Sequence, residues 1–222
     1  MFHTTCERPW LVARFPQMQR MVSWSLARPG FVEAPAVAWL EVGNAELCAV
    51  ADPARWFRDK LAGRGLADAV GMMTARNVAR HERAVRVVEG VGADCLITLG
   101  LNNGEHVGRR VGAHLHPLNA GTINILCALS VPATDGALLE AASIVTQART
   151  VALVEEGYRR PGRAEIVTGT GTDCIVVSAP LGEEPTPYAG MHTALGEAVG
   201  DAVLSATRAA IRAWRADYAQ DA

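Results

Sequence analysis

The sequence lacks several features that would place it in a large class of proteins. Its 222 residues carry a net charge of −2 with scattered acids and bases, so no basic patch for nucleic acid or an anionic membrane surface is predicted. It has no run of about 18 consecutive apolar residues, and its N-terminus, MFHTTCERPW, has an acid and a proline where a signal peptide is apolar. We therefore expect a cytoplasmic protein that binds neither nucleic acid nor membranes.

Two reactive residue types are scarce or unfavourably spaced. The five cysteines are widely separated and form no CxxC pair, which argues against a zinc knuckle or a redox centre. Cys95, Cys127 and Cys174 lie in or beside apolar runs, where a free thiol is usually buried and inert. Lys60 is the single lysine, which argues against Schiff-base chemistry.

Short apolar runs between turn residues predict strands over much of the chain. The length and the apolar half of the composition allow one sizeable core, so we expect one domain over residues 1–222. The expected strands are Met21–Leu26, Ala36–Val42, Glu46–Ala51, Arg83–Val91, Asp94–Leu101, Gly121–Val131 and Cys174–Ala179. Hairpins are expected around Gly43-Asn44 and around Gly92-Ala93-Asp94.

Three helices are expected between or after these strands. Asp52-Pro53 precedes a short helix that ends at Gly63, and a longer helix runs from Asp135 to Gly157. The third begins at Thr193 and has an alanine-rich face that can approach a sheet closely. The predicted fold class is α+β, a mixed β-sheet with two long helices packed on it in a layered sandwich.

The stretch VTGTGTDC, from Val167 to Cys174, is the first candidate for chemistry. It is neither a P-loop nor a dinucleotide-binding loop, because it lacks the lysine and the GxGxxG spacing and precedes a strand. Glycine lets the backbone pass close to a ligand, and hydroxyl and carboxylate groups can bind one. These groups belong to Gly169, Thr170, Gly171, Thr172 and Asp173. The alternative is a tight turn that starts a strand, with Asp173 capping it.

The histidines offer two further candidates. His192 opens the last predicted helix, where the helix dipole disfavours the imidazolium form and leaves a neutral ring suited to a general base. It could instead cap the helix or pack against Tyr188. His114 and His116 alternate along an extended segment and could bind a metal, with His106 or His81 supplementing them.

Asparagines cluster at two predicted strand ends. Asn102 and Asn103 follow one strand, and NAGTINI places polar groups at the entry to another. Carboxamides both donate and accept hydrogen bonds, which suits recognition of amide groups on a ligand. Turn formation is the alternative, and we favour it for Asn102 and Asn119.

Several of these motifs, taken in order, resemble one known family. The segments VGMMTA, TLGLNNG, AGTINILCALSVP, TQART, TGTGTDCIVVSAP and YAGMHTALGEAVG, between about Val70 and Val203, are similar to the adenosylcobinamide amidohydrolases, the CbiZ family. The resemblance implies hydrolysis of the amide that joins the aminopropanol arm to the corrin ring, releasing adenosylcobyric acid in corrinoid salvage. The corrinoid, with its cobalt, is then the substrate. We expect no cofactor and no metal site, and a homo-oligomer is compatible with the sequence.

Amide hydrolysis needs a nucleophile, oxyanion donors and an acid for the leaving amine. We expect acid and base roles for Asp173 and His192, with Thr170 or Thr172 holding water or acting as nucleophile. Backbone N–H groups of residues 169–172 would form the oxyanion hole. The expected substrate-binding residues are Asn103, Gly121, Thr122, Asn124, Gly169 and Gly171, with Trp24 and Trp39 as an apolar floor.

Two alternatives remain open on the sequence. One is a corrinoid-binding protein without catalysis, which would use the same apolar and amide groups. The other is a metal-dependent hydrolase of a different small amide, which would use His114 and His116.

Overall fold

The computed structural model describes residues 1–43, 46–47, 50–109 and 121–220. The helices in these residues are α2 (Pro53–Gly63), the 3-10 turn η1 (Val78–Arg80), α3 (Asp135–Glu156) and α4 (Ala194–Gln220). The strands are β1 (His3–Glu7), β2 (Trp10–Ser23), β3 (Gly30–Glu41), β4 (Val70–Thr74), β5 (Glu82–Val88), β6 (Val91–Leu99), β7 (Gly104–Glu105), β8 (Ile123–Leu129), β9 (Gly169–Thr170) and β10 (Cys174–Pro180).

Eight of these strands form one mixed sheet, which confirms the predicted α+β class. Their order is β4-β3-β2-β10-β8-β6-β5, with β1 added alongside β2. The pairs β3/β4 and β8/β10 are parallel and the others are antiparallel. The short strands β7 and β9 form a separate two-stranded ribbon.

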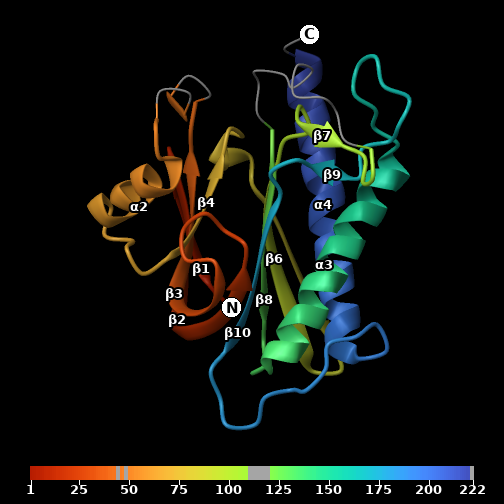
Figure 1. Ribbon diagram of the computed structural model, residues 1–222. Helices are drawn as coiled ribbons and strands as arrows, with labels where there is room; N and C mark the ends of the chain where they lie inside the picture. Colours follow the sequence, from red (N-terminus) through yellow and green to blue (C-terminus); the bar gives the residue numbers. More distant parts are fainter. Residues whose placement is uncertain (44–45, 48–49, 110–120, 221–222) are drawn as a thin grey trace.

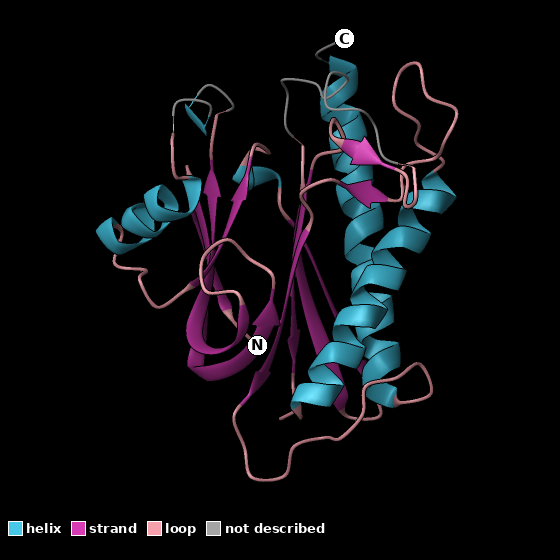
Figure 2. Ribbon diagram, viewed as in Figure 1, coloured by secondary structure: helices cyan, strands magenta, loops and turns pink. Residues whose placement is uncertain are grey.

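The sheet folds over on itself, so the elements stack in layers (Figure 1). Helix α2 lies outside β1–β4, and α3 and α4 cover the far side of β6, β8 and β10 (Figure 2). Between the two halves of the sheet, side chains such as Leu11 and Trp39 from one half meet Leu96 and Val176 from the other. A second core lies between β6, β8, β10 and the two long helices.

Strand β2 joins the two halves of the sheet. It has 14 residues, and its pairing with β3 changes register between Arg14 and Gln19. After this irregularity, β2 pairs with β10 from Gln19 to Ser23. A register shift of this kind bends a strand and increases its twist, so it allows one sheet to supply two facing layers.

The ends of the two long helices agree with the sequence predictions. Thr134 caps α3 by accepting the N–H of Ala137, and Gly157 ends it in the left-handed conformation at φ 63°. Thr193 accepts the N–H of Gly196 at 2.9 Å and so caps α4. By length and composition alone, helix α3 could cross a membrane, but it packs against α4 and β10 in the core.

One predicted strand and its hairpin are wrong. Within the predicted strand Glu46–Ala51, Glu46 and Leu47 are helical and Val50 and Ala51 lie outside any strand; the remaining two positions are outside the described residues. The N–H groups of Glu46 and Leu47 donate to the carbonyl of Gly43, which winds the chain into a turn. Strand β3 pairs instead with β4, in parallel. Local apolar content alone could not distinguish a strand from this turn.

Candidate active site

A cavity of about 720 Å³ opens where β10 and β8 begin. It lies between the two halves of the sheet, so its walls come from segments distant in sequence. Its lining residues are Trp24, Ser25, Leu26, Pro29, Val42, Leu47, Met72, Met73, Thr74, Ala75, Thr122, Asn124, Gly171, Thr172, Asp173 and Cys174. Most of this lining is apolar, and its polar groups gather at the start of β8 and on the loop before β10.

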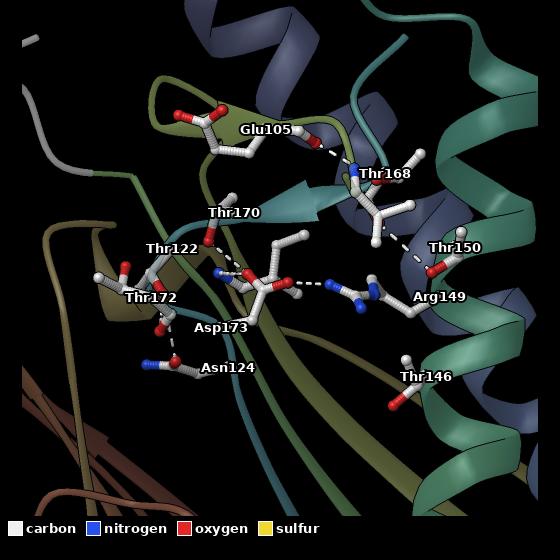
Figure 3. Close-up of polar contacts among 12 residues, drawn as sticks. Glu105, Thr122, Asn124, Thr146, Arg149, Thr150, Thr168, Thr170, Thr172 and Asp173 are labelled. Atoms are coloured by element: carbon white, nitrogen blue, oxygen red, sulfur yellow. Dashed lines mark hydrogen bonds and ion pairs between the residues drawn. The ribbon is translucent and has the colours of Figure 1, made fainter. Parts of the chain in front are cut away.

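Asp173 is the centre of the polar contacts at this end of the sheet (Figure 3). One carboxylate oxygen, Oδ1, accepts hydrogen bonds from the hydroxyl of Thr170 and from the N–H of Ile123, the latter at 3.3 Å. The other, Oδ2, accepts from the guanidinium of Arg149 on α3. The Asp173 side chain is 13% exposed and that of Arg149 10%, so this ion pair is largely shielded from water.

Gly169 packs closely against the contact between Arg149 and Asp173. A Cβ atom at residue 169 would lie 2.5 Å from Nη1 of Arg149 and 2.8 Å from Oδ2 of Asp173. A Cβ atom at these distances would force the end of the Arg149 or Asp173 side chain to shift, whereas glycine leaves the pair as it is. The predicted ligand approach at Gly169 is therefore occupied by the protein's own guanidinium group.

Arg149 is the functional residue that sequence reasoning missed. It lies in the TQART segment of α3, which helped to reveal the family resemblance but gave no sign of which helix face turns inward. Burial lowers the pKa of Arg149 to about 10, so the guanidinium is still protonated at pH 7. A charged arginine in a helix that otherwise buries apolar residues was the available signal.

Three residues near Asp173 line the same cavity. Asn124 and Cys174 lie opposite each other in the parallel pairing of β8 and β10. Both line the cavity, as does Thr122, whose hydroxyl donates to the carbonyl of Thr172 at 2.8 Å. The Asn124 amide donates to the carbonyl of Met73 at 2.7 Å, which ties β8 to the end of β4.

The loop before β10 has one backbone donor with no partner in the described part of the chain. The N–H of Gly171 donates to the carbonyl of Asn103 at 3.3 Å. Asn103 therefore lies beside this loop, as its prediction as a binding residue requires. Among the described residues, no hydrogen bond engages the N–H of Thr172, which lines the cavity.

Trp24 lines the cavity and directly follows the part of β2 that pairs with β10. Its indole Nε1 donates to the main-chain carbonyl of Asp173 at 2.7 Å, although the side chain is 54% exposed. Trp24 therefore lines the cavity as expected. Trp39 does not, because it is fully buried between the two sheet halves and belongs to the core.

Cys174 lines the cavity but is not suited to act as a nucleophile. Burial raises the pKa of the Cys174 thiol to about 12, so the reactive thiolate is scarce at neutral pH. Burial also raises the pKa of Cys127 to about 12, and that of Cys95 well above its ordinary value. These results agree with the inert role expected for the three thiols.

Comparison with protein families assigns the whole chain. A family model described as "CbiZ: Adenosylcobinamide amidohydrolase" matches residues 1–219. The chain belongs to the adenosylcobinamide amidohydrolase family. Membership makes it a carbon–nitrogen hydrolase that acts on an amide of adenosylcobinamide in corrinoid salvage, as the resemblance implied.

Two curated relatives extend this comparison. An adenosylcobinamide amidohydrolase of Methanosarcina mazei is 27% identical over 169 residues, which cover 72% of this chain and 74% of that protein. An uncharacterized protein of Methanocaldococcus jannaschii is 40% identical over 84 residues, but this match spans 37% of the chain and only 32% of the archaeal protein.

Two solved structures are distantly similar. A protein of Pyrococcus horikoshii aligns over 91% of this chain and 77% of its own, with 12% identity and a TM-score of 0.46. The L-aminopeptidase D-Ala-esterase/amidase of Ochrobactrum anthropi aligns over 96% and 83%, with 14% identity and a TM-score of 0.40. Both TM-scores are below 0.5, so nothing about the chemistry of the amidohydrolase follows from them.

The structure does not bring His192 to Asp173. Asp173 precedes β10, whereas His192 follows the far end of that strand and is exposed in the turn before α4. At that end, the N–H of Ala189 donates to Glu140 near the start of α3, while Arg149 lies more than two turns further along the same helix. Because the full length of β10 lies between them, His192 and Asp173 are about 20 Å apart along the sheet. The predicted acid–base pair is thus corrected: local sequence showed the helix start but not which end of the sheet it occupies.

Of the remaining predicted site residues, Gly121 is in the described part of the chain and the two histidines are not. Gly121 sits where β8 meets the end of β6, because a Cβ atom there would lie 2.8 Å from the N atom of Asn102. His114 and His116, the predicted metal ligands, fall outside the described residues. Within the described residues there is no group of three or more His, Cys, Asp or Glu that could hold a metal ion.

Proposed function

We propose that this amidohydrolase cleaves the amide between the aminopropanol arm and the corrin ring at the loop formed by residues 169–173, releasing adenosylcobyric acid. The hydrogen bond from the Thr170 hydroxyl to the Asp173 carboxylate carries this proposal. A hydroxyl that donates to a fixed carboxylate has a proton acceptor in place before the substrate arrives. Asp173 lines the large cavity, in which a bulky ligand would lie, and Thr170 contacts it from the preceding loop.

The chemistry follows from this arrangement. Asp173 accepts the proton of the attacking oxygen, which belongs either to Thr170 or to a water held by Thr170. The attack forms a bond to the amide carbon, and the N–H of Thr172 donates to the developing oxyanion. The C–N bond then breaks as protonated Asp173 returns the proton to the leaving amine. If Thr170 attacks, a water cleaves the resulting ester in a second round and regenerates the hydroxyl.

Arg149 has a positioning role in this scheme. It binds Oδ2 of Asp173, so Oδ1 faces Thr170 and the two contacts together fix the carboxylate plane. Because the guanidinium is buried and charged, it also offsets the negative charge of Asp173 in a site with little water. His192 has no part in the proposed reaction.

The cavity supplies the binding surface for the corrinoid. Its apolar lining, with Trp24, Met72 and Met73, suits the methyl-rich ring, and polar groups at the start of β8 suit its amide arms. Asn103 lies beside Gly171, which supports its assignment to an arm near the scissile bond. Thr122 and Asn124 already hold the cavity wall together, so we assign them to shaping the site as well as to lining it.

We further propose that the enzyme works in the cytoplasm without an added cofactor. The proposed steps use only groups of the chain, and the described cysteines are free thiols, as a reducing compartment requires. Dialysis against a strong chelator should leave turnover unchanged. Loss of activity with the chelator, restored by one divalent metal, would instead support the hydrolase that uses His114 and His116.

The decisive experiment compares Asp173→Asn, Thr170→Ala and Thr170→Ser, with Asp59→Asn on α2 as a matched control. Adenosylcobyric acid is measured by liquid chromatography and mass spectrometry. We expect Asp173→Asn to lower kcat by about 10²–10⁴-fold, the usual contribution of a general base, while the control keeps full activity. Full activity of Asp173→Asn would remove this residue from the mechanism.

The threonine variants separate the two possible attacking groups. If Thr170 is the nucleophile, Thr170→Ala is inactive, Thr170→Ser retains activity, and acid quenching traps an ester on the chain. If water attacks, Thr170→Ala keeps measurable turnover and no ester forms. A protein that binds adenosylcobinamide but never releases adenosylcobyric acid would instead be a binding protein.

A further inference from the structure

The segment between β2 and β3, residues 24–29, forms one wall of the large cavity. It starts where the end of β2 pairs with β10, and it reaches β4, where Ala27 forms an isolated bridge with Gly71. The segment therefore passes from one half of the sheet to the other beside the cavity. Its lining residues are Trp24, Ser25, Leu26 and Pro29.

Buried and exposed side chains alternate along this segment. Ser25 and Ala27 are buried, and the Ser25 hydroxyl donates to the carbonyl of Ala27 at 2.8 Å. The N–H of Gly71 donates to the same carbonyl at 3.2 Å. Trp24 and Leu26 are 54% and 42% exposed and line the cavity. The buried contacts hold the backbone, so these two apolar side chains are left to meet a ligand.

Arg28 has a backbone conformation that arginine rarely adopts. Its φ is 62°, in the left-handed region, although it is not a glycine. This conformation is unfavourable for residues with a side chain, because the Cβ atom comes too close to the following carbonyl oxygen. A strained residue persists only where its surroundings hold it in place, so the contacts of the Arg28 side chain must offset the strain.

The Arg28 guanidinium binds the main chain of two neighbouring segments. Its Nη1 donates to the carbonyl of Asp68, just before β4, at 2.6 Å, and its Nη2 donates to the carbonyl of Glu33 in β3 at 2.8 Å. The Asp68 carboxylate lies 3.6 Å from Nη1 but is 86% exposed, so this ion pair contributes little. The two charge-assisted hydrogen bonds therefore anchor the wall segment where it reaches β4.

We propose that Arg28 is a positioning residue for substrate binding. By anchoring residues 24–29 at β4, it holds Leu26 and Pro29 in the wall against which the corrinoid lies. The inference rests on the proposed function, which puts the corrinoid in this cavity. Trp24 is held separately, by the main-chain carbonyl of Asp173. Loss of the guanidinium should therefore weaken substrate binding and leave the chemical step unchanged.

The first test measures KM and kcat for adenosylcobinamide with three substitutions of Arg28. We expect Arg28→Ala to raise KM at least about fivefold and to keep kcat within about twofold of wild type. Arg28→Gly adopts a positive φ without strain but also lacks the guanidinium, so it should raise KM as much. Arg28→Lys keeps one flexible donor, and its KM should lie between those of wild type and Arg28→Ala. A wild-type KM in Arg28→Gly would show that the side chain anchors nothing, and would overturn the proposal.

Two controls separate positioning from stability. Arg58→Ala, which removes an exposed arginine on α2, should keep both constants. Ile211→Val removes a methyl group from the core face of α4, so it should lower Tm and leave KM unchanged. An equal rise of KM in Ile211→Val and Arg28→Ala would show that any loss of stability weakens binding, and would also overturn the proposal.

Trp24→Ala, which changes the wall itself, distinguishes this inference from the proposed function. If Trp24→Ala raises KM and Arg28→Ala does not, Arg28 has no positioning role and the proposed function stands. If neither variant changes KM, the corrinoid binds elsewhere, and both the positioning role and the place given to the substrate are wrong. A rise of KM in both variants, with kcat kept in Arg28→Ala, is the result that we expect.

Discussion

The indole Nε1 of Trp24 donates to the main-chain carbonyl of Asp173 at 2.7 Å, just beyond the segment where β2 pairs with β10. The two residues are 149 positions apart in the chain. One side of this contact is a wall of the cavity, and the other is the residue proposed to move protons. The contact therefore links the binding surface to the reacting group.

Trp24→Phe should separate these two contributions, because it keeps an aromatic face and removes the donor. We expect kcat/KM to fall by about 2–10-fold, since one hydrogen bond contributes about 0.5–1.5 kcal/mol. Trp24→Ala should lower kcat/KM further, mainly by raising KM. Trp56→Phe, on α2 outside this cavity, serves as the control. Wild-type constants in Trp24→Phe would show that the indole N–H has no part in positioning Asp173.

Gly169→Ala should disturb the reaction without removing any proposed catalytic group. The new Cβ would lie 2.5 Å from Arg149 and 2.8 Å from Asp173, so the end of at least one of these side chains must shift and the geometry of the ion pair changes. We expect kcat to fall at least about tenfold with a smaller change in KM, as for a group that acts only in the transition state. Gly136→Ala is the matched control, because its nearest neighbour is 3.7 Å away. Equal activity of the two variants would contradict the role given to the ion pair.

Cys174→Ala should retain hydrolysis, although the thiol lines the cavity. With a pKa raised by burial to about 12, the thiol loses its proton only in strong alkali and stays a neutral, weak nucleophile at pH 8. Native protein at pH 8 should likewise show no alkylation of Cys95, Cys127 or Cys174 by iodoacetamide, read by mass spectrometry. Rapid modification of Cys174, with loss of activity, would mean that the cavity opens in solution.

Glu41 should make stability depend on pH in the acid range. Burial alone would raise the pKa of this carboxyl, but hydrogen bonds from Arg8 and from the N–H of Val78 outweigh it and lower the pKa. The folded chain therefore binds a proton less readily than the unfolded chain. The stabilisation is complete above the ordinary pKa of 4.5 and is lost as the pH falls through the lower folded value.

Thermal unfolding at several pH values tests this sign. Wild type should have a higher Tm than Glu41→Gln at pH 7, and the two should converge in acid. Glu46→Gln, which changes an exposed carboxyl, should have the same Tm as wild type at every pH. A constant difference between wild type and Glu41→Gln at every pH would show that ionisation of Glu41 has no effect on stability.

Local sequence predicted most of the helices and strands, but few of the pairings between them. The β5/β6 hairpin was predicted, but its turn is at Glu89 and Gly90, both with positive φ, three residues before the expected position. The glycine at the second turn position fits this geometry, which an apolar pattern alone does not locate. The N-terminal strand β1 and the first half of β2 were not predicted, because polar and apolar residues there do not alternate cleanly.

The sequence by itself determined the family, the α+β class, the ends of the long helices and the importance of the segment before β10. These depend on glycine, capping residues and apolar periodicity, which act over a few neighbouring residues. Only the tertiary structure decided which side chains meet. It placed Arg149 on Asp173 and removed His192 to the other end of the sheet, because such contacts depend on how a helix and a strand pack, and neither periodicity nor spacing encodes that.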